Sequence, residues 1–542
     1  MYKQAQHVSL KDTITEQSTQ SFDAIIIGAG LGGLLSAAQL LEHGKRVLLV
    51  ERLPHCGGRF TAKTFHGVQV STGAVHMVPF GSSGVLSQML QRLHVPHYFF
   101  DADVFGSFHV HGKQYQARGI LGVFKFLGLR QFALLVALGY QMFLRKLPQR
   151  ERILPYSVWL KQHIDIANNP QLVAFFERVS RFALSLELSQ VSTAEVVEIT
   201  KNMLRYGAPA IVRGGCGGLT SELEHYVIAH GGMLQLSCEV LQILHEDGHV
   251  TGVRIREKAS GRESVFIAPV VVSDIGPRAT DGLLHSHKVT QVQVLRQQAM
   301  HEKQEEEESE MHKAGRPQGS PLHVGETLAV SLPIMHEGVS LPIMHEGVSL
   351  PIMHEAVGLK IHILSDVSLI PHKGIMYCLD TKRIAGMVQP TNSEPRLAPA
   401  GKHLLISHQV IQSNNVEEER TLALADLRMM FGETFDRHCR ILTMGTYRGE
   451  WPVNRMAQGE DVHAETAIQG LYLVGDAVKP PGYLMVEGVA QSVNSFLDVL
   501  DEQGQECLRQ RHVLPPPPRR HALRWLFKAP GNAGKNKQVR KR

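Results

Sequence analysis

Residues 22–51 read FDAIIIGAGLGGLLSAAQLLEHGKRVLLVE. The apolar run at residues 24–27 is typical of a buried parallel strand. Residues 34–43 can form a helix that stops at Gly44. A second apolar run at residues 47–50 predicts another buried strand. The segment therefore predicts strand, tight turn, helix and strand, which is the opening unit of an α/β fold with a parallel sheet.

The turn after the first strand carries the pattern G-x-G-x-x-G at Gly28, Gly30 and Gly33. Gly28 permits the tight turn, Gly30 lets the backbone approach a pyrophosphate, and Gly33 lets helix and strand pack closely. Free N–H groups at the start of the helix can bind the phosphates. Glu51 closes the second strand, where a carboxylate can accept both hydroxyls of a ribose. We therefore predict a dinucleotide site, whose loop is completed by Ala29, Leu31 and Gly32.

A second glycine motif follows the acidic residue. Arg52 starts a loop that ends in Gly57-Gly58-Arg59, which predicts a backbone that passes close to the cofactor and a guanidinium for its phosphates. With this motif the chain resembles the flavin amine oxidase-like superfamily, and within it the phytoene (carotenoid) desaturase-related branch. The resemblance implies FAD as the cofactor and a Rossmann-like FAD-binding domain of the glutathione-reductase type.

Further segments are similar to that branch in chain order, and they comprise residues 67–74, 212–219, 270–274 and 470–477. The resemblance implies FAD contacts for Gly73 and for the backbone near Val240, on the adenine side. It implies that Gly475 and Asp476 bind the ribityl–phosphate region. After Gly482 it implies a helix whose N-terminus points at the flavin pyrimidine, where the helix dipole favours reduced flavin.

These landmarks predict a discontinuous FAD-binding domain over residues 22–80, 208–282 and 440–502, with an inserted α+β substrate domain over residues 81–207 and 283–439. The ends are expected to be a flexible N-terminus at 1–21 and a basic, proline-containing tail at 503–542. Within the substrate domain, the acidic run at 301–318 predicts a solvated linker. The nonapeptide repeat at 330–356, which reads VSLPIMHE plus Gly or Ala, predicts one duplicated strand or loop.

The substrate domain contains an apolar segment at residues 119–146. Its longest uncharged stretch, residues 131–144, is too short for a membrane span. A helix lying in a membrane interface suits the basic residues that flank its apolar turns, and these are Lys125, Arg130, Arg145 and Lys146. A buried helix of the substrate domain fits the same pattern, so a peripheral membrane association stays open.

Charge and cysteine usage exclude several classes of protein. The net charge is +5, but residues 511–542 hold ten Lys or Arg and no acidic residue, which argues against a body that binds nucleic acid. The six cysteines form no CxxC pair, so neither a disulfide framework nor a metal site is expected. His245 to His249 spell H-E-x-x-H, but Asp247-Gly248 predicts a hairpin there instead of a zinc-binding helix. The N-terminus lacks an apolar signal region, so we expect a cytoplasmic protein.

Together these features predict an FAD-dependent oxidoreductase that desaturates a lipophilic isoprenoid or carotenoid-like substrate by hydride transfer to the flavin. Three alternatives stay open: a flavin-dependent carotenoid isomerase, an amine oxidase-like enzyme, and a non-enzymatic lipid-binding escort of the GDP-dissociation-inhibitor type. The catalytic residues and the oligomeric state stay unassigned. Arg448, Trp451 and Glu487 are weak catalytic candidates, each with a structural role as the competing explanation.

Overall fold

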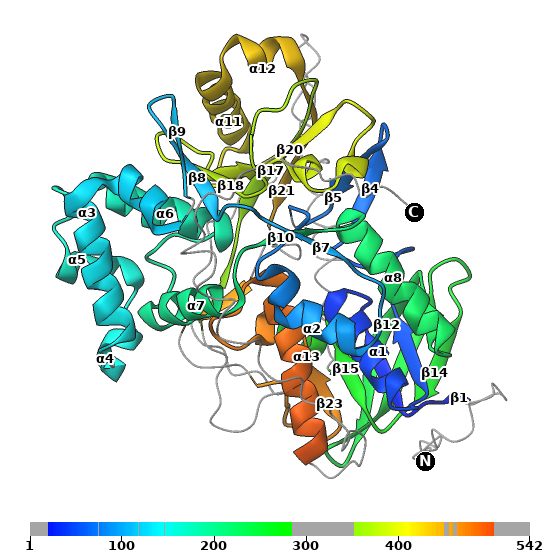
Figure 1. Ribbon diagram of the computed structural model, residues 1–542. Helices are drawn as coiled ribbons and strands as arrows, with labels where there is room; N and C mark the ends of the chain where they lie inside the picture. Colours follow the sequence, from blue (N-terminus) through cyan, green and yellow to red (C-terminus); the bar gives the residue numbers. More distant parts are fainter. Residues whose placement is uncertain are drawn as a thin grey trace, which may run out of the picture.

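The structure is a computed structural model that describes residues 20–73, 75–117, 119–145, 147–284, 352–448, 455–458 and 463–502 (Figure 1). The described chain is built on two large sheets, one with five strands and one with seven. The acidic linker, the first two copies of the repeat and the basic tail lie outside the described residues.

The five-stranded sheet is parallel, with the strand order β11-β3-β2-β15-β23. Its strands are β2 (Ala24–Ile27), β3 (Val47–Val50), β11 (Met233–Gln235), β15 (Val271–Ser273) and β23 (Leu471–Leu473). The first strand lies in the middle and the chain crosses to both of its sides, as in doubly wound Rossmann-like folds. This arrangement confirms the predicted fold class, and β2 and β3 have the predicted bounds.

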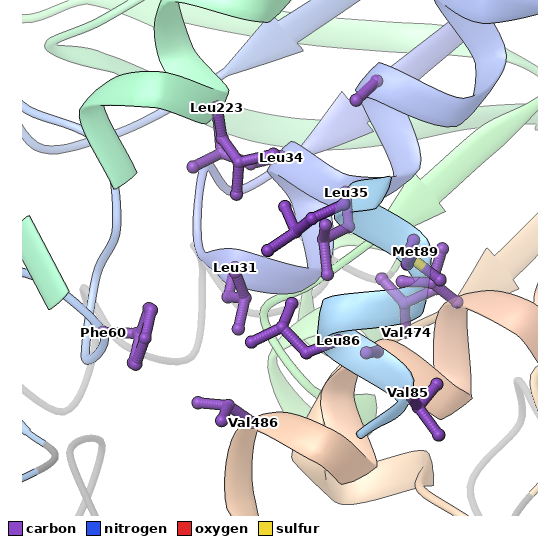
Figure 2. Packing of buried hydrophobic residues seen from close by; sticks show 14 of the residues in the cluster. Leu31, Leu34, Leu35, Phe60, Val85, Leu86, Met89, Leu223, Val474 and Val486 are labelled. Carbon is purple, nitrogen blue, oxygen red and sulfur yellow. The ribbon is translucent and has the colours of Figure 1, made fainter. Parts of the chain in front are cut away.

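Helices cover one face of this sheet, and they are α1 (Leu31–Glu42), α2 (Val85–Arg92), α8 (Gly215–Ala229) and α13 (Met485–Glu502). Figure 2 shows Leu35 of α1 near Leu86 and Met89 of α2 and Val474 just after β23, while Leu34 of α1 lies on the side of α8. All five side chains are almost fully buried, and each buried leucine contributes about 1.5–3 kcal/mol. The last described helix, α13, packs against both α1 and α2.

A four-stranded sheet with the order β1-β14-β13-β12 covers the opposite face. Its strands are β1 (Gln20–Ser21), β12 (Cys238–Glu246), β13 (His249–Glu257) and β14 (Glu263–Ile267). Ile25 and Ile27 pack toward it while Ile26 packs toward the helices, because successive side chains of a strand point to opposite faces. The prediction of a flexible N-terminus over residues 1–21 is wrong for residues 20 and 21, because these two residues form β1 and pair with β14.

The hairpin predicted at Asp247-Gly248 joins β12 to β13. Both residues have positive φ, 49° and 77°, which is the geometry that tight hairpin turns require. His245 and His249 therefore lie on two different strands and share no helical face.

The seven-stranded sheet has the order β21-β17-β20-β19-β18-β8-β9. Its strands are β8 (Gly106–Val110), β9 (Lys113–Gln116), β17 (Gly358–Ser365), β18 (Ile375–Cys378), β19 (Gly386–Val388), β20 (His403–Val410) and β21 (Cys439–Tyr447). One predicted boundary needs correction here. We assigned residues 440–447 to the FAD-binding domain, but β21 pairs with β17 along its whole length, so this segment belongs to the second sheet.

Helices and short strands surround the two sheets. The helices on the side of the second sheet are α3 (Gly119–Phe143), α4 (Gln149–Arg152), α5 (Tyr156–His163), α6 (Pro170–Ala183), α7 (Thr193–Tyr206), α11 (Val416–Phe431) and α12 (Glu433–His438), and α9 (Pro277–Leu284) follows β15. The small sheets are β4 (Ala62–Phe65) with β5 (Val68–Ser71), β10 (Ala210–Val212) between β6 (Met77–Val78) and β7 (Phe99–Asp101), and β16 (Ile352–Glu355) with β22 (Arg455–Gln458). β16 lies in the last copy of the repeat, so the described end of the repeat is a strand.

Candidate functional site

The glycine-rich turn leads directly from β2 into α1. Helix α1 begins at Leu31, three residues earlier than predicted, with Gly30 as its N-cap. Gly28 has a φ of 94°, and a Cβ at Gly33 would collide with the carbonyl oxygen of Gly28. The turn therefore needs glycine at both positions, and it holds the start of α1 tightly against β2.

Glu51 is buried at the end of β3, and its carboxylate reaches the glycine-rich turn. Its Oε2 accepts a hydrogen bond from the N–H of Ala29 at 2.8 Å, and its Oε1 accepts one from the N–H of Leu53 at 2.8 Å. An ionised carboxylate has about four acceptor positions, so this one retains capacity for hydroxyl groups. The structure thus fixes Glu51 where the dinucleotide pattern requires an acid.

The Gly-Gly-Arg loop packs onto the same turn. The N–H of Gly57 donates to the carbonyl of Ala29 at 2.7 Å, and Gly57 forms a bridge with Gly30. Gly57 and Gly58 have φ values of 97° and 51°, which favour glycine. The loop therefore lies beside the glycine-rich turn, while the predicted Arg52 is exposed at its start.

Arg59 ties this loop to the C-terminal part of the chain. Its guanidinium donates two hydrogen bonds to the carboxylate of Asp476, at 2.7 and 2.9 Å. Asp476 is almost fully buried, and Gly475 before it has a φ of 108°. The paired, planar geometry is that of a strong charge-assisted contact. Three predicted stretches, at residues 28–33, 57–59 and 475–476, are therefore brought together.

Asp274 is a further acid at this point that the sequence analysis did not single out. It follows β15, and its partly buried carboxylate accepts a hydrogen bond from the N–H of Gly33. A Cβ at Gly32 or Gly475 would lie 2.5 or 2.8 Å from its Oδ1, and a Cβ at Gly30 would also collide with the carboxylate. Burial raises the pKa of Asp274 to about 7, and the neighbouring carboxylates add to this shift. A carboxylate at the carboxyl end of a parallel strand was the signal that could have found it.

Gly73 lies where strand β17 of the seven-stranded sheet contacts the segment that follows β5. Its carbonyl accepts a hydrogen bond from the Nζ of Lys360 at 2.8 Å, and the same Nζ donates to the carbonyl and hydroxyl of Ser71, both at 3.0 Å. The Nζ also lies 5.0 Å from the ring centre of Tyr447, whose hydroxyl donates to the carbonyl of Thr72. Burial lowers the pKa of Lys360 to about 7. At neutral pH this amine can therefore gain or lose a proton.

Neutral histidines surround Lys360. The Nδ1 of His76 accepts a hydrogen bond from the N–H of Cys216, so its Nε2 carries the proton and donates to the carbonyl of Gln69. Burial lowers the pKa of His76 to about 4, and it lowers the pKa of His362 and His408 too. These rings therefore add no positive charge near the amine at neutral pH.

The remaining predicted cofactor residues lie around this centre. Val240 is buried in β12, in the layer that packs on β2 and β3. Gly482 has a φ of 84°, donates its N–H to Glu195 and accepts from the side chain of Asn202, so it is fixed on α7 just before α13 begins.

The three catalytic candidates have different outcomes. Arg448 is partly buried directly after β21, and Trp451 lies outside the described residues. Glu487 is fully buried and faces α2, where its Oε2 accepts the N–H of Leu86 at 2.9 Å and its carboxylate also accepts from Val85 and Phe80. This contact fixes α13 to the start of α2, so the structure gives Glu487 a capping role.

The residues present fit a dinucleotide with two phosphates and a ribose. The turn has glycine where a Cβ would collide with neighbouring protein atoms, a buried carboxylate ends β3, and a guanidinium lies beside the loop. We find no cluster of three or more His, Cys, Asp or Glu side chains arranged for a metal in the part of the chain that the structure describes.

Comparison with known proteins agrees with this geometry. Residues 26–93 match the family model described as NAD(P)-binding Rossmann-like domain. An uncharacterized protein of Methanocaldococcus jannaschii is 29% identical over 88% of this chain and 98% of its own length. Prolycopene isomerase 2 of an Oncidium hybrid cultivar is 26% identical, over 48% of this chain and 49% of the isomerase. The chain thus spans about half the length of that isomerase.

Solved structures extend the likeness to most of the fold. An oxidoreductase from Methanosarcina mazei is 29% identical and superposes with a TM-score of 0.68, covering 88% of this chain and 99% of its own. Putrescine oxidase superposes with a TM-score of 0.57 over 89% of this chain and all of its own, at 13% identity, which shows a shared fold.

Proposed function

This chain is a member of the flavin amine oxidase-like superfamily of oxidoreductases, and from that premise we propose that it binds FAD and desaturates a lipophilic isoprenoid or carotenoid-like substrate. The observation that carries the proposal is the convergence of Gly28–Gly33, Glu51, Arg59 and Asp476 at one edge of the parallel sheet. When bound, FAD supplies the hydride acceptor.

The residues of this chain hold and orient that group. The N-terminus of α1 would offer N–H groups to the pyrophosphate, and Glu51 would accept the hydroxyls of the adenosine ribose. The Arg59–Asp476 pair fixes the loop beside the phosphates. The helix α13 begins at Met485, just after Gly482, and its positive end would stabilise the negative charge that develops on a flavin bound next to it.

Lys360 is the group that we assign to proton transfer. Desaturation removes a hydride and a proton from neighbouring carbons, so a proton acceptor is needed near the substrate. The Nζ of Lys360 is buried where β17 meets residues 71–73, held by Ser71 and Gly73, and is partly neutral at pH 7 because burial lowers its pKa. A neutral amine can accept the proton.

Isomerisation of a polyene is the second candidate. It is favoured by the similarity to prolycopene isomerase over about half of that enzyme. An amine substrate is the third reading, since the fold is shared with putrescine oxidase. A non-enzymatic escort would have no use for Glu51, Arg59 and Asp476, which are all present and organised here.

Anaerobic mixing of the FAD-loaded protein with a panel of polyenes and amines tests the proposal. We expect a polyene to bleach the flavin absorbance and to yield a product lighter by two hydrogens. An unchanged product mass together with flavin dependence identifies an isomerase. Bleaching by amines alone identifies an amine oxidase. Protein that takes up no FAD overturns the proposal.

A further inference from the structure

Helix α3 leaves an apolar face uncovered. The exposed fractions of Leu129, Val136 and Tyr140 are 75%, 57% and 59%, and Leu121 and Leu144 are exposed by 73% and 77%. From Leu129 onward the exposed positions recur every three or four residues, so they form one stripe along the helix. Soluble surfaces rarely gather large apolar side chains in this way.

The opposite face of α3 belongs to the core. Leu138 and Met142 are buried in the cluster that contains Tyr156 and Trp159, and α3 contacts α6 and β9. Gly128 has a φ of 72° and kinks the helix. Among the described helices, only this one has a segment long and apolar enough to cross a membrane, Leu121–Phe143, with a mean hydropathy of 1.7 and 17% of its most apolar window buried.

These two faces distinguish lying on a membrane from spanning one. A single helix that spans the bilayer would be surrounded by lipid, whereas α3 is packed on one side against the rest of the protein. The prediction that the uncharged stretch alone is too short for a span is consistent with this geometry, because Lys125 and Arg130 interrupt the longer apolar segment and are both exposed. The exposed stripe therefore fits the boundary between head groups and acyl chains.

The surroundings of α3 are basic. Residues 119–163 contain seven Lys or Arg and one acidic residue, Glu151. Arg130, Arg145 and Arg150 are exposed, at the middle of α3, after its end and at the start of α4. In Figure 1, α3 to α6 form an outlying layer on the side of the molecule away from β1 and β14. Nothing in the described chain lies over this layer's apolar stripe, since those side chains are exposed.

We propose that α3 and the basic residues around it dock this protein onto an anionic lipid bilayer. The apolar stripe enters the interface, and the guanidinium groups bind the negatively charged head groups. The bilayer is favoured over a protein partner because an exposed apolar stripe with a predominantly basic border matches its chemistry. The docking needs no flavin, so it stands or falls separately from the proposed reaction.

Co-sedimentation with lipid vesicles tests the proposal on the full chain. We expect the protein to sediment with phosphatidylcholine vesicles that contain phosphatidylglycerol, and to bind vesicles of phosphatidylcholine alone more weakly. Added salt should weaken the binding to the anionic vesicles, because it screens the basic residues.

Two exposed substitutions test the stripe itself. Leu129→Ser with Val136→Ser should weaken partitioning by about tenfold or more, because both apolar contacts with lipid are lost. The matched control is Ile228→Ser with Met429→Ser, which removes two similarly exposed side chains from α8 and α11 and should bind as the original protein does. Arg130→Gln with Arg145→Gln should remove most of the preference for anionic vesicles.

Four outcomes would overturn the proposal. The original protein could fail to sediment with either kind of vesicle. The α3 variant could bind as tightly as the control, or a variant with Arg519, Arg520 and Arg524 replaced by Gln could alone abolish binding, which would assign it to the tail. A dimer in solution that the α3 variant converts to a monomer would assign the stripe to a second copy of the chain.

Discussion

The guanidinium of Arg59 and the carboxylate of Asp476 are 417 positions apart in the chain and form two parallel hydrogen bonds of 2.7 and 2.9 Å. The pair joins the loop after β3 to the end of β23, on either side of the glycine-rich turn. Asp476→Asn should weaken FAD binding by about 2–3 kcal/mol, because the charge-assisted pair is lost and Arg59 is left beside a neutral group.

Equilibrium titration with FAD measures this effect. The control is Glu433→Gln, which breaks the exposed pair with Arg437 and should leave FAD binding unchanged. Equal affinity for Asp476→Asn and the original protein would show that the pair has no part in the cofactor site.

Glu51→Gln tests the ribose contact. We expect FAD retention to weaken by about 1–3 kcal/mol, because an amide forms weaker hydrogen bonds to hydroxyls than a carboxylate does. The flavin content of the purified protein, measured by absorbance, checks the prediction. Unchanged flavin content would contradict the assignment of Glu51.

Because Asp274 lies at the start of α1, we expect the affinity for FAD to depend on pH. The phosphates bring further negative charge to the start of α1, beside a carboxyl whose pKa is already raised to about 7 by burial and by Asp476 and Glu51, with Arg59 acting in the opposite direction. Binding therefore favours the protonated acid, and affinity should fall as the pH rises through about 7, by at most about tenfold per pH unit. Titrations across this range should show a flat profile for Asp274→Asn; an equal slope in both proteins would exclude Asp274.

The same acid should affect the stability of the protein without FAD. Its pKa in the folded state is above the ordinary value near 4, so the stability that its protonated form provides is complete below about pH 4 and is lost as the pH rises to about 7. Thermal unfolding of Asp274→Asn should lose this part of the pH dependence.

Lys360→Met should leave the flavin bound while slowing substrate-dependent bleaching by at least about a hundredfold, the contribution typical of a general base. In the original protein the rate should fall as the pH drops through about 7, because the amine becomes protonated, and Lys360→Met should lose this inflection. The rate of flavin bleaching, measured without oxygen as a function of pH in both proteins, checks this prediction. A full rate with the inflection retained would exclude Lys360.

Glu487→Gln tests whether Glu487 has a structural role or a catalytic one. The carboxylate caps α2 from α13, so the variant should lower the free energy of unfolding by about 1–3 kcal/mol and leave the rate of flavin reduction unchanged. Denaturant unfolding and anaerobic kinetics give the two values. A slowed reaction in a variant of normal stability would return Glu487 to the catalytic candidates.

Local patterns predicted the first unit well because its signals lie within thirty residues. The bounds of β2 and β3, the turn at Gly28 and the position of Glu51 all follow from neighbouring residues. Helix α1 starts three residues early because the glycines themselves adopt helical geometry.

Long-range contacts explain what sequence reasoning missed. Lys360 looks like an ordinary strand residue in GLKIHI, and it is buried only because Ser71 and Gly73 lie against it from far away in the chain. The prediction that residues 440–447 belong to the FAD-binding domain is wrong, because the sequence of this segment does not identify β17 as its neighbour. The role of Asp274 could not be predicted because the sequence does not show that β15 lies beside β2.

Reconstitution of the purified full chain with FAD measures whether the four groups of residues form a cofactor site. We expect the chain to take up a single FAD, and we expect Glu51→Gln and Asp476→Asn each to reduce its affinity while the control Glu433→Gln does not. A protein that binds no FAD, or one whose FAD affinity is the same in all four chains, would contradict it.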